Sequence, residues 1–378
     1  MNNMTPFREV FFLLPALHGG GAERVTLSLL RAFQASTGWR PVLVLTTRHK
    51  GLLDEELPED IEVIRLGASR GLAAIPKLLW LLRQRKPDVV FTSLDHVNST
   101  MGLLQPLLPR RTRLVMRATS FRSLGSSLMR RLLRHAFLRA DLAVFQSDKM
   151  REGMMEQLSL PADHHNVVVA NPLDKARILA RAAAPLAEVR PSWPGDSPEM
   201  GPEGDFAAAR RLRLVAVGGL YWAKGFDLLI EAIRLLKRDD IRLVILGQGE
   251  QEAQLRQQIL DAGVADRVRL AGFQPNPYPW LRQADGFVLS SRVEGFPNVV
   301  LEALTCDCPV VATPVPGLEE MPGVCLSDSF TAEDLARAIA AFAEAPHDPE
   351  ADKVLPRFEI SAVQRRYETL FDSLIERS

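Results

Sequence analysis

Two carboxylates eight positions apart, Glu294 and Glu302, flank the segment of this chain with the clearest chemical content. Glu294 precedes a Gly-Phe-Pro turn, and Glu302 lies inside an apolar run. Pro297 fits the first turn of a helix, because its fixed φ and missing N–H cost nothing there. A helix beginning there places the carboxylates about 10 Å apart, with free N–H groups between them that favour an anion. This layout suits a nucleotide-sugar, which has hydroxyls at both ends and a diphosphate between them.

Lys224 and a glycine triplet are further candidates for binding an anion. Lys224 lies just ahead of a helical run whose N-cap we expect to be Asp227. A cation there opposes the positive end of the helix dipole unless an anion lies between them. Gly19, Gly20 and Gly21 stand between an expected strand and an expected helix, where glycines let backbone N–H groups approach a ligand. A solvated loop lysine and a tight turn remain the alternative explanations, since neither loop matches a P-loop or a dinucleotide fingerprint.

Short apolar runs alternate with amphipathic stretches along the chain. This pattern is typical of βα units around parallel sheets, and such units must position the candidate residues. In the first half, strands are expected at 9–14, 41–46, 89–93, 113–116, 142–146 and 167–170. In the second half, they are expected at 212–217, 242–246, 268–271, 286–290 and 309–312. Each half therefore predicts its own doubly wound α/β sheet, with ligands bound outside the carboxyl ends of the strands.

The length of 378 residues fits two domains. A segment rich in proline and glycine, 185–204, separates the two halves and predicts an exposed connector, because neither a helix nor a central strand tolerates it. The expected organisation is a first domain over 1–175, a linker over 176–211, a second domain over 212–355 and a C-terminal helix over 356–378. We expect that helix to pack back on the first domain.

Composition excludes several classes of protein. The net charge of zero argues against nucleic-acid binding. Cys306, Cys308 and Cys325 are odd in number and lack a matching histidine cluster, so we expect buried thiols in a reducing compartment rather than a disulfide framework or a metal site. No apolar run approaches the ~18 residues of a membrane span. The apolar stretch 10–17 is short for a signal peptide and leads into glycines, so a cytoplasmic protein is expected.

Taken together, the motifs resemble the large family of retaining glycosyltransferases typified by bacterial mannosyl- and N-acetylhexosaminyl-transferases, family four or "glycosyl transferases group 1". The strongest signal is the Glu-x7-Glu segment with Lys224-Gly-Phe upstream. The resemblance covers nearly the whole chain and includes residues 19–24, 140–148, 171–174, 218–227, 246–249, 291–302 and 309–317. It implies the GT-B fold, in which two Rossmann-like domains face each other across a cleft.

The resemblance also implies a donor site made of Gly20, Gly21, Lys224, Gly272, Phe273, Glu294, Gly295, Phe296, Asn298 and Glu302. In this site Glu302 accepts hydrogen bonds from the ribose, Lys224 binds the diphosphate and Glu294 lies beside the transferred sugar. The glycines 20 and 21 line the phosphates from the first domain, and the nucleotide base rests near residues 272 and 273. The family normally needs no metal, so no cofactor is expected besides the nucleotide diphosphate sugar, which is the donor substrate.

Two positions depart from the family pattern. The family commonly has arginine at the position of Gly219, so a second cation for the diphosphate is missing here. Arg292 is one candidate replacement, and a solvent-facing arginine is the alternative. Many members carry a histidine where this chain has Arg117, and Arg117 is therefore a third catalytic candidate beside Lys224 and Glu294, facing the acceptor or a phosphate.

An arginine-rich stretch in the first half suggests a partner. Nine arginines and no acidic residue lie between His96 and Ala140. An expected helix there keeps one face apolar, with leucines 124, 128, 132 and 133 among its residues, and places Arg130, Arg131 and Arg134 on other faces. An ordinary surface helix and a helix docked on an anionic membrane both fit this pattern.

The sequence and the resemblance thus predict a retaining, metal-independent glycosyltransferase that acts in cell-surface polysaccharide synthesis, with UDP favoured over GDP. It would transfer a hexose or N-acetylhexosamine to a glycan or a polyprenyl-diphosphate-linked acceptor. The alternatives are a nucleotide-sugar epimerase on the same fold and a non-catalytic partner subunit that binds nucleotide-sugar or membrane.

Overall fold

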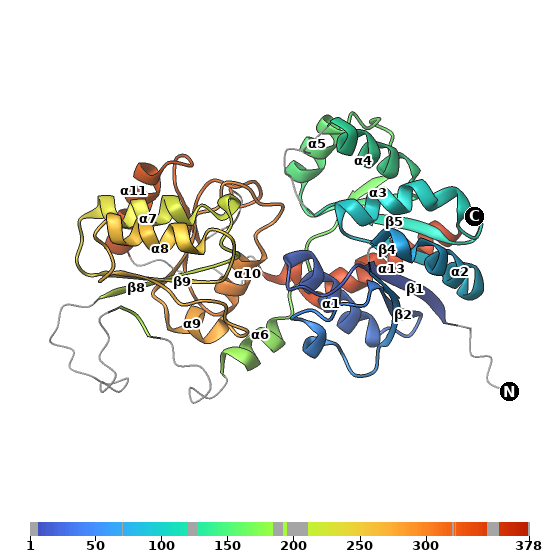
Figure 1. The fold of residues 1–378 in the computed structure, drawn as a ribbon, viewed down its shortest axis with the longest axis horizontal. Helices are drawn as coiled ribbons and strands as arrows, with labels where there is room; N and C mark the ends of the chain where they lie inside the picture. The colour runs from blue at the N-terminus through green and yellow to red at the C-terminus, as the bar shows by residue number, and fades with distance from the viewer. Residues whose placement is uncertain are drawn as a thin grey trace. The chain divides into compact units, whose positions relative to one another are not determined.

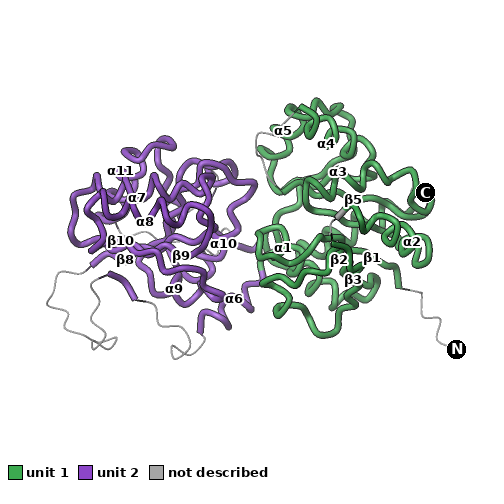
Figure 2. Tube along the Cα trace, in the orientation of Figure 1, with its two compact units in different colours: residues 1–173, 357–378 green, residues 174–356 purple. Residues whose placement is uncertain are grey.

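The structure, a computed structural model, describes residues 7–69, 71–119, 127–183, 192–194, 211–319, 321, 323–345 and 355–376. It divides into two compact units (Figure 2). Unit 1 comprises Met1–Leu173 and Arg357–Ser378, and unit 2 comprises Asp174–Pro356. Each unit is a parallel sheet with helices on both faces (Figure 1), so the expected fold class of two doubly wound domains is confirmed.

The sheet of unit 1 has seven parallel strands in the order β3-β2-β1-β4-β5-β6-β7. Their bounds are β1 Arg8–Leu14, β2 Trp39–Thr47, β3 Glu62–Ala68, β4 Val89–Thr92, β5 Arg113–Arg117, β6 Leu142–Phe145 and β7 Asn166–Val168. The central strands are buried on both faces, which explains why they read as unbroken apolar runs in the sequence. β3 was not expected from the sequence, because it is an edge strand in which half-buried and exposed residues predominate.

Helices of unit 1 enclose the sheet in two layers, each with its own apolar core. One face is covered by α1 (Gly21–Gln34) and α13 (Ile360–Glu376), and the other by α2 (Ile75–Arg85), α3 (Asp95–Leu104), α4 (Ser127–Arg139) and α5 (Asp148–Gln157). Short 3-10 turns are η1 (Asp54–Glu56), η2 (Gly71–Ala74), η3 (Gln105–Leu107) and η5 (Leu355–Phe358), the last at the boundary between the units.

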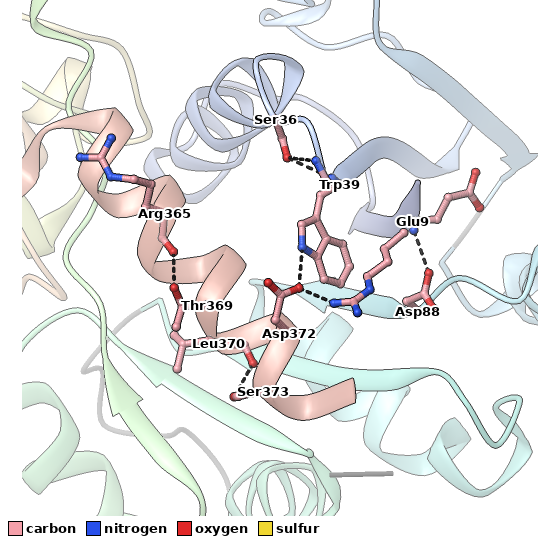
Figure 3. A network of polar contacts seen from close by, with 11 residues as sticks. Glu9, Ser36, Trp39, Asp88, Arg365, Thr369, Leu370, Asp372 and Ser373 are labelled. Atoms are coloured by element: carbon pink, nitrogen blue, oxygen red, sulfur yellow. Dashed lines mark hydrogen bonds and ion pairs between the residues drawn. The ribbon is translucent and has the colours of Figure 1, made fainter. Parts of the chain in front are cut away.

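The C-terminal helix α13 packs on unit 1 through an apolar stripe of Val363, Tyr367, Phe371 and Leu374. Polar contacts along its edge add to this packing (Figure 3). The Asp372 carboxylate accepts hydrogen bonds from Arg8 at 2.5 Å and from the Trp39 indole at 3.1 Å. The helix therefore supplies part of the core of unit 1, although the residues of unit 2 separate it in the sequence from the rest of unit 1.

Unit 2 has six parallel strands in the order β10-β9-β8-β11-β12-β13. The strands are β8 Leu212–Val217, β9 Ile241–Leu246, β10 Val268–Leu270, β11 Gly286–Leu289, β12 Val310–Ala312 and β13 Val324–Leu326. The helices are α6 (Lys175–Ala182), α7 (Phe226–Leu236), α8 (Glu252–Asp261), α9 (Tyr278–Gln283), α10 (Asn298–Thr305) and α11 (Ala332–Glu344), with a 3-10 turn η4 (Trp222–Lys224). Helices α7, α8 and α11 cover one face and α9 and α10 the other (Figure 1).

The expected linker over 176–211 is wrong in two places. Its beginning is helix α6, which the Asp174 carboxylate caps by accepting a hydrogen bond from the Arg177 N–H at 3.0 Å. Trp193, expected in an exposed segment, is buried: its indole donates to the Leu214 carbonyl at 3.1 Å and packs on Trp280. The prolines and glycines of this segment argue against a helix or a central strand, but they do not exclude a buried apolar side chain such as Trp193. The rest of this segment, 184–191 and 195–210, lies outside the described residues.

Candidate functional site

The candidate residues of unit 2 gather where its strand order reverses. β8 and β11 are neighbours in the sheet, yet the chain continues from β8 to β9 on one side and from β11 to β12 on the other. Ligands of doubly wound sheets bind at such a switch point, outside the carboxyl ends of the strands. Lys224 follows β8 and Glu294 follows β11, so the topology brings together two residues that are 70 positions apart.

Lys224 and Glu294 form an ion pair at this edge. The lysine Nζ donates to the Glu294 Oε1 at 2.6 Å, and the side chains are 27% and 10% exposed. The Ser291 hydroxyl donates to the same carboxylate oxygen at 2.7 Å. Ser291 was not among the residues expected in the site, although it lies three positions before Glu294 in the sequence. Partial burial reduces the solvent screening between the two charges, and an entering anion would compete with Glu294 for Lys224.

Helix α7, which follows Lys224, begins differently from the expectation. Its N-cap is Gly225 at φ +63°, and Asp227 lies in the first helical turn. The Asp227 carboxylate accepts two hydrogen bonds from Arg292, at 2.7 and 2.6 Å. Asp227 is therefore a partner of Arg292 rather than a cap. Arg292, proposed either as a replacement cation or as a solvent-facing side chain, is 17% exposed and its charge is balanced by Asp227.

The segment after Glu294 leads into helix α10. Pro297 is the N-cap of this helix, one position before the first turn in which we expected it. Gly295, Phe296 and Asn298 line this entry, and Glu302 lies in the second turn. All four are half-buried and thus retain surface for a ligand. The structure therefore keeps the expected arrangement of one carboxylate in the entering loop and one inside the helix.

Gly272 and Phe273 follow β10 at the same edge of the sheet. Gly272 has φ +72°, and its carbonyl accepts a hydrogen bond from the Gly247 N–H at 2.8 Å. The Phe273 side chain is 36% exposed. The loops after β8 and β9 are joined as well, since the Leu220 N–H donates to the Gln248 carbonyl at 2.9 Å. Three successive loops thus support one another beside the Lys224–Glu294 pair.

Gly219, where the family commonly has arginine, is covered by an aromatic ring. A Cβ at this position would lie 2.4 Å from Cε2 of Tyr221 and 2.7 Å from its Cδ2. Any side chain at 219 therefore requires the Tyr221 ring to move. Tyr221 and Trp222 are 47% and 58% exposed, so the turn presents two aromatic rings beside the position where the family commonly has an arginine.

In unit 1, the glycine triplet forms the start of α1. Gly20 is the N-cap, and the buried Glu23 carboxylate accepts hydrogen bonds from the Gly19 N–H at 2.6 Å and the Gly20 N–H at 2.9 Å. This role of Glu23 was not expected, although a glutamate three residues after an N-cap is a known capping signal. Two of the N–H groups that we expected to face a ligand are therefore occupied from within the protein.

Arg117 ends β5 and is 3% exposed. Its guanidinium donates to the Asn171 side chain and is hydrogen bonded to Tyr367, and burial lowers the pKa of Arg117. Its Nη1 atom has no hydrogen-bond partner among the described residues. The contacts of Arg117 thus connect the sheet to α13 and to the segment that leaves unit 1. A role toward acceptor or phosphate remains a prediction.

Helix α4 carries the arginine-rich stretch. Leu133, Ala136 and Phe137 are buried, whereas Leu128 is 63% exposed. All four arginines of this helix are exposed: Arg130, Arg131, Arg134 and Arg139. Leu124, expected on the apolar face, lies outside the described residues.

Neither a membrane span nor a metal cluster occurs in the described parts of the chain. None of the helices there has the length and apolar character needed to cross a bilayer. No group of three or more His, Cys, Asp or Glu residues is arranged there to hold a metal ion.

Two family models match most of the chain between them. The model described as Glycosyltransferase Family 4 matches residues 19–177, and the model described as Glycosyl transferases group 1 matches residues 211–345. The first match covers the sheet of unit 1 except β1, and the second covers the sheet of unit 2. Together they include every candidate residue named above.

Curated relatives and solved structures are similar to parts or all of the chain. The Campylobacter jejuni N-acetylgalactosamine-N,N'-diacetylbacillosaminyl-diphospho-undecaprenol 4-alpha-N-acetylgalactosaminyltransferase is 40% identical over 100 residues, which are 26% of this chain and 27% of that protein. The amylovoran biosynthesis glycosyltransferase AmsK of Erwinia amylovora is 34% identical over 43% of this chain and 42% of its own. These matches span less than half of either relative. Anabaena HepE, solved with UDP-glucose, has the same fold, with a TM-score of 0.77 at 19% identity over 97% of this chain and 99% of its own.

Proposed function

The chain belongs to glycosyltransferase family four, and on that premise we propose that it transfers a hexose or N-acetylhexosamine from a nucleotide diphosphate sugar, with UDP favoured. The acceptor is a glycan or a polyprenyl-diphosphate-linked glycan, and the setting is cell-surface polysaccharide synthesis on the cytoplasmic side. The C. jejuni relative, an undecaprenol-diphosphate glycan transferase by name, and the amylovoran biosynthesis glycosyltransferase AmsK support this choice of acceptor and pathway. The single observation that carries the proposal is the Lys224–Glu294 pair at the switch point of unit 2.

The pair explains how the site can exchange partners when a donor binds. In the structure Glu294 balances the charge of Lys224, which lies just before the positive end of α7. A diphosphate brings its own negative charge, takes over Lys224 and leaves Glu294 to contact the sugar. Glu302 accepts hydrogen bonds from the ribose hydroxyls, and Gly272 and Phe273 support the base. The donor therefore replaces the internal ion pair with two separate contacts.

The proposed reaction is retaining and needs no metal. We infer that the acceptor hydroxyl attacks the anomeric carbon on the same face from which the diphosphate leaves, so that no covalent intermediate with Glu294 is needed. The departing diphosphate oxygen takes the acceptor proton, while Lys224 and the α7 N–H groups stabilise its charge. Glu294 orients the sugar and stabilises positive charge at the reacting carbon.

Donor titrations test the site assignment. Lys224→Ala and Glu302→Ala should each weaken UDP binding at least tenfold, about 1.4 kcal/mol, when measured by isothermal titration calorimetry. Lys237→Asn is the matched control, since Lys237 is an exposed lysine at the other end of the same helix, in a left-handed conformation that asparagine tolerates. Unchanged UDP affinity in both site variants would refute the assignment.

The two alternatives differ from a transferase in turnover. An epimerase converts the donor with no acceptor present, and a non-catalytic subunit converts nothing. A mass-spectrometric screen of UDP-, GDP- and TDP-sugars with and without lipid-linked acceptors separates the three. Acceptor-dependent release of the nucleotide diphosphate is the outcome that the transferase requires, and retention is read from the anomeric configuration of the product.

We also propose that α4 contacts an anionic membrane surface. Exposed apolar side chains of this helix, Leu128, Met129 and Leu138, lie among the exposed arginines 130, 131 and 134. Each basic residue near such a surface contributes up to about 1 kcal/mol. Flotation with vesicles containing anionic lipid should fall when these three arginines become Glu. Absence of binding by the parent protein rejects the contact, and the helix is then an ordinary surface helix.

A further inference from the structure

The Lys224 turn and the Glu294 loop are joined by contacts that do not involve the Lys224–Glu294 pair. The Ala223 carbonyl accepts hydrogen bonds from the N–H groups of Arg292 at 2.8 Å and Val293 at 3.3 Å. The Ser290 hydroxyl donates to the Lys224 carbonyl at 2.9 Å. The segment after β8 and the segment after β11 therefore run side by side at the switch point, and their spacing sets the distance between the two charged site residues.

The Arg292 side chain adds a second layer to this junction. Besides its two hydrogen bonds to Asp227, the guanidinium donates to the Trp222 carbonyl at 3.0 Å. Its carbon lies 5.0 Å from the centre of the Trp222 ring, at the distance of a cation–π contact. One side chain of the Glu294 loop thus contacts both η4 and the first turn of α7.

This junction is needed because donor binding disrupts the other link. If a diphosphate takes over Lys224, the 2.6 Å ion pair to Glu294 is lost at the moment when both side chains must be correctly placed. The contacts of Arg292 with Asp227 and Trp222 involve neither Lys224 nor Glu294. They can therefore persist in the liganded state, and a bidentate Arg–carboxylate pair is among the most geometrically specific links available.

We propose that Arg292 is a positioning residue, which acts through Asp227 and Trp222 to hold Lys224 and Glu294 in register for the donor. This inference rests on the proposed function, because it assigns Arg292 a part in donor binding at the same site. The rival role is direct binding of the diphosphate as the missing second cation. Two observations favour positioning. The Asp227 carboxylate already balances the charge of Arg292, and the Tyr221 ring packs over Gly219, the position where the family commonly has an arginine.

The variants Asp227→Asn and Arg292→Gln distinguish the two roles. A positioning pair predicts that each variant weakens UDP binding about tenfold and that the double variant is no weaker than either single one. A direct ligand predicts that Asp227→Asn leaves UDP affinity unchanged or tightens it, because the substitution frees the arginine charge. That outcome would overturn the proposal. Arg292→Lys is a second test of the two roles. Lysine keeps the charge but not the bidentate geometry, so for a positioning residue it should bind UDP no better than Arg292→Gln does.

A matched control lies on the same helix. Glu231 and Arg234 of α7 form another bidentate pair, at 2.8 and 2.6 Å, away from the site and partly exposed. The double variant Glu231→Gln with Arg234→Gln should leave UDP affinity and transfer rate unchanged. The conservative variant Asp227→Glu, which keeps the carboxylate, should recover part of the affinity lost in Asp227→Asn.

Hydrogen–deuterium exchange without any nucleotide tests the junction independently of the reaction. Asp227→Asn should speed exchange in peptides covering 219–226 and 290–296, whereas the control pair on α7 should not. Unchanged exchange in both peptides refutes positioning even if donor affinity falls. If the parent protein binds none of UDP, GDP or TDP, the proposed function fails, while the exchange experiment still decides whether Arg292 orders the two loops.

Discussion

Gly225, the N-cap of α7, permits a close approach between the two loops of the site, and replacing it with alanine should damage both stability and donor binding. Its φ of +63° is in the left-handed region, which costs an L-residue about 1–2 kcal/mol. A Cβ there would also lie 2.0 Å from the Ser290 carbonyl oxygen. Inserting a methyl group into such a contact costs a further ~1–3 kcal/mol. Gly225→Ala should therefore destabilise unit 2 by about 2–5 kcal/mol, a large part of the ~5–15 kcal/mol of a typical domain.

Gly263 provides the control that separates these two costs. It has nearly the same backbone conformation, φ +64°, but no atom lies within 4 Å of the position of its Cβ. Gly263→Ala should lose only the left-handed term, about 1–2 kcal/mol. It should also leave UDP affinity unchanged, because the loop after α8 does not touch Lys224 or Glu294.

Urea unfolding and calorimetric titration with UDP measure both effects. Unfolding of unit 2 should shift to lower urea in Gly225→Ala than in Gly263→Ala, and UDP binding should weaken at least tenfold only in the former. The physical reason is that Ser290 and Lys224 must move apart to admit the methyl group. Equal stability and equal UDP affinity in the two alanine variants would refute the argument that this contact sets the spacing of the site.

Two further predictions follow from buried groups. Burial raises the pKa of Tyr367 to about 12 from 10.0, so the folded state holds the phenol proton more tightly than the unfolded state does. The free energy of unfolding should therefore be unaffected by this group below pH 10 and fall as the pH rises toward 12. This fall should be smaller in Tyr367→Phe when the two proteins are compared by urea unfolding at each pH, and an identical pH profile would contradict it. Burial also raises the pKa of Cys306 to about 12 and that of Cys308 further, so iodoacetamide at pH 8 should label neither thiol in the native protein but both in urea; rapid native labelling, read by mass spectrometry, would contradict this.

The parts of the fold that could be predicted are those with strong local signals. β1 and β9 have a neighbouring strand on each side, and the apolar runs 10–14 and 243–246 within them predict buried strands. β3 was missed because charged residues and a glycine interrupt its apolar residues, and β13 because its three residues are too few to form an apolar run. Trp193 was missed for another reason: its burial against Trp280 depends on a contact 87 residues away in the sequence, which local composition does not reveal.

The candidate site also contains residues that the sequence predicts and contacts that it does not. Lys224, Glu294 and Glu302 could be named from the sequence because their spacing matched a known pattern. The contacts that organise them could not be, since the pairing of Arg292 with Asp227 depends on β8 and β11 being neighbours in the sheet. The N-cap of α7 was assigned to Asp227 because aspartate is favoured at that position, whereas the approach of Ser290 leaves room only for glycine.

The chain leaves unit 1 and returns to it at adjacent points. The Leu173 N–H donates to the Phe358 carbonyl at 2.7 Å, and the Ile360 N–H donates to the Leu173 carbonyl at 3.1 Å. In topological terms, unit 2 is a domain inserted into unit 1, and the insertion begins and ends at one short parallel bridge. During synthesis, all of unit 2 leaves the ribosome before α13 does. Unit 1 therefore cannot complete its core until α13 has been synthesised, because the Phe371 ring packs on Phe33 and the Tyr367 ring packs on Phe91.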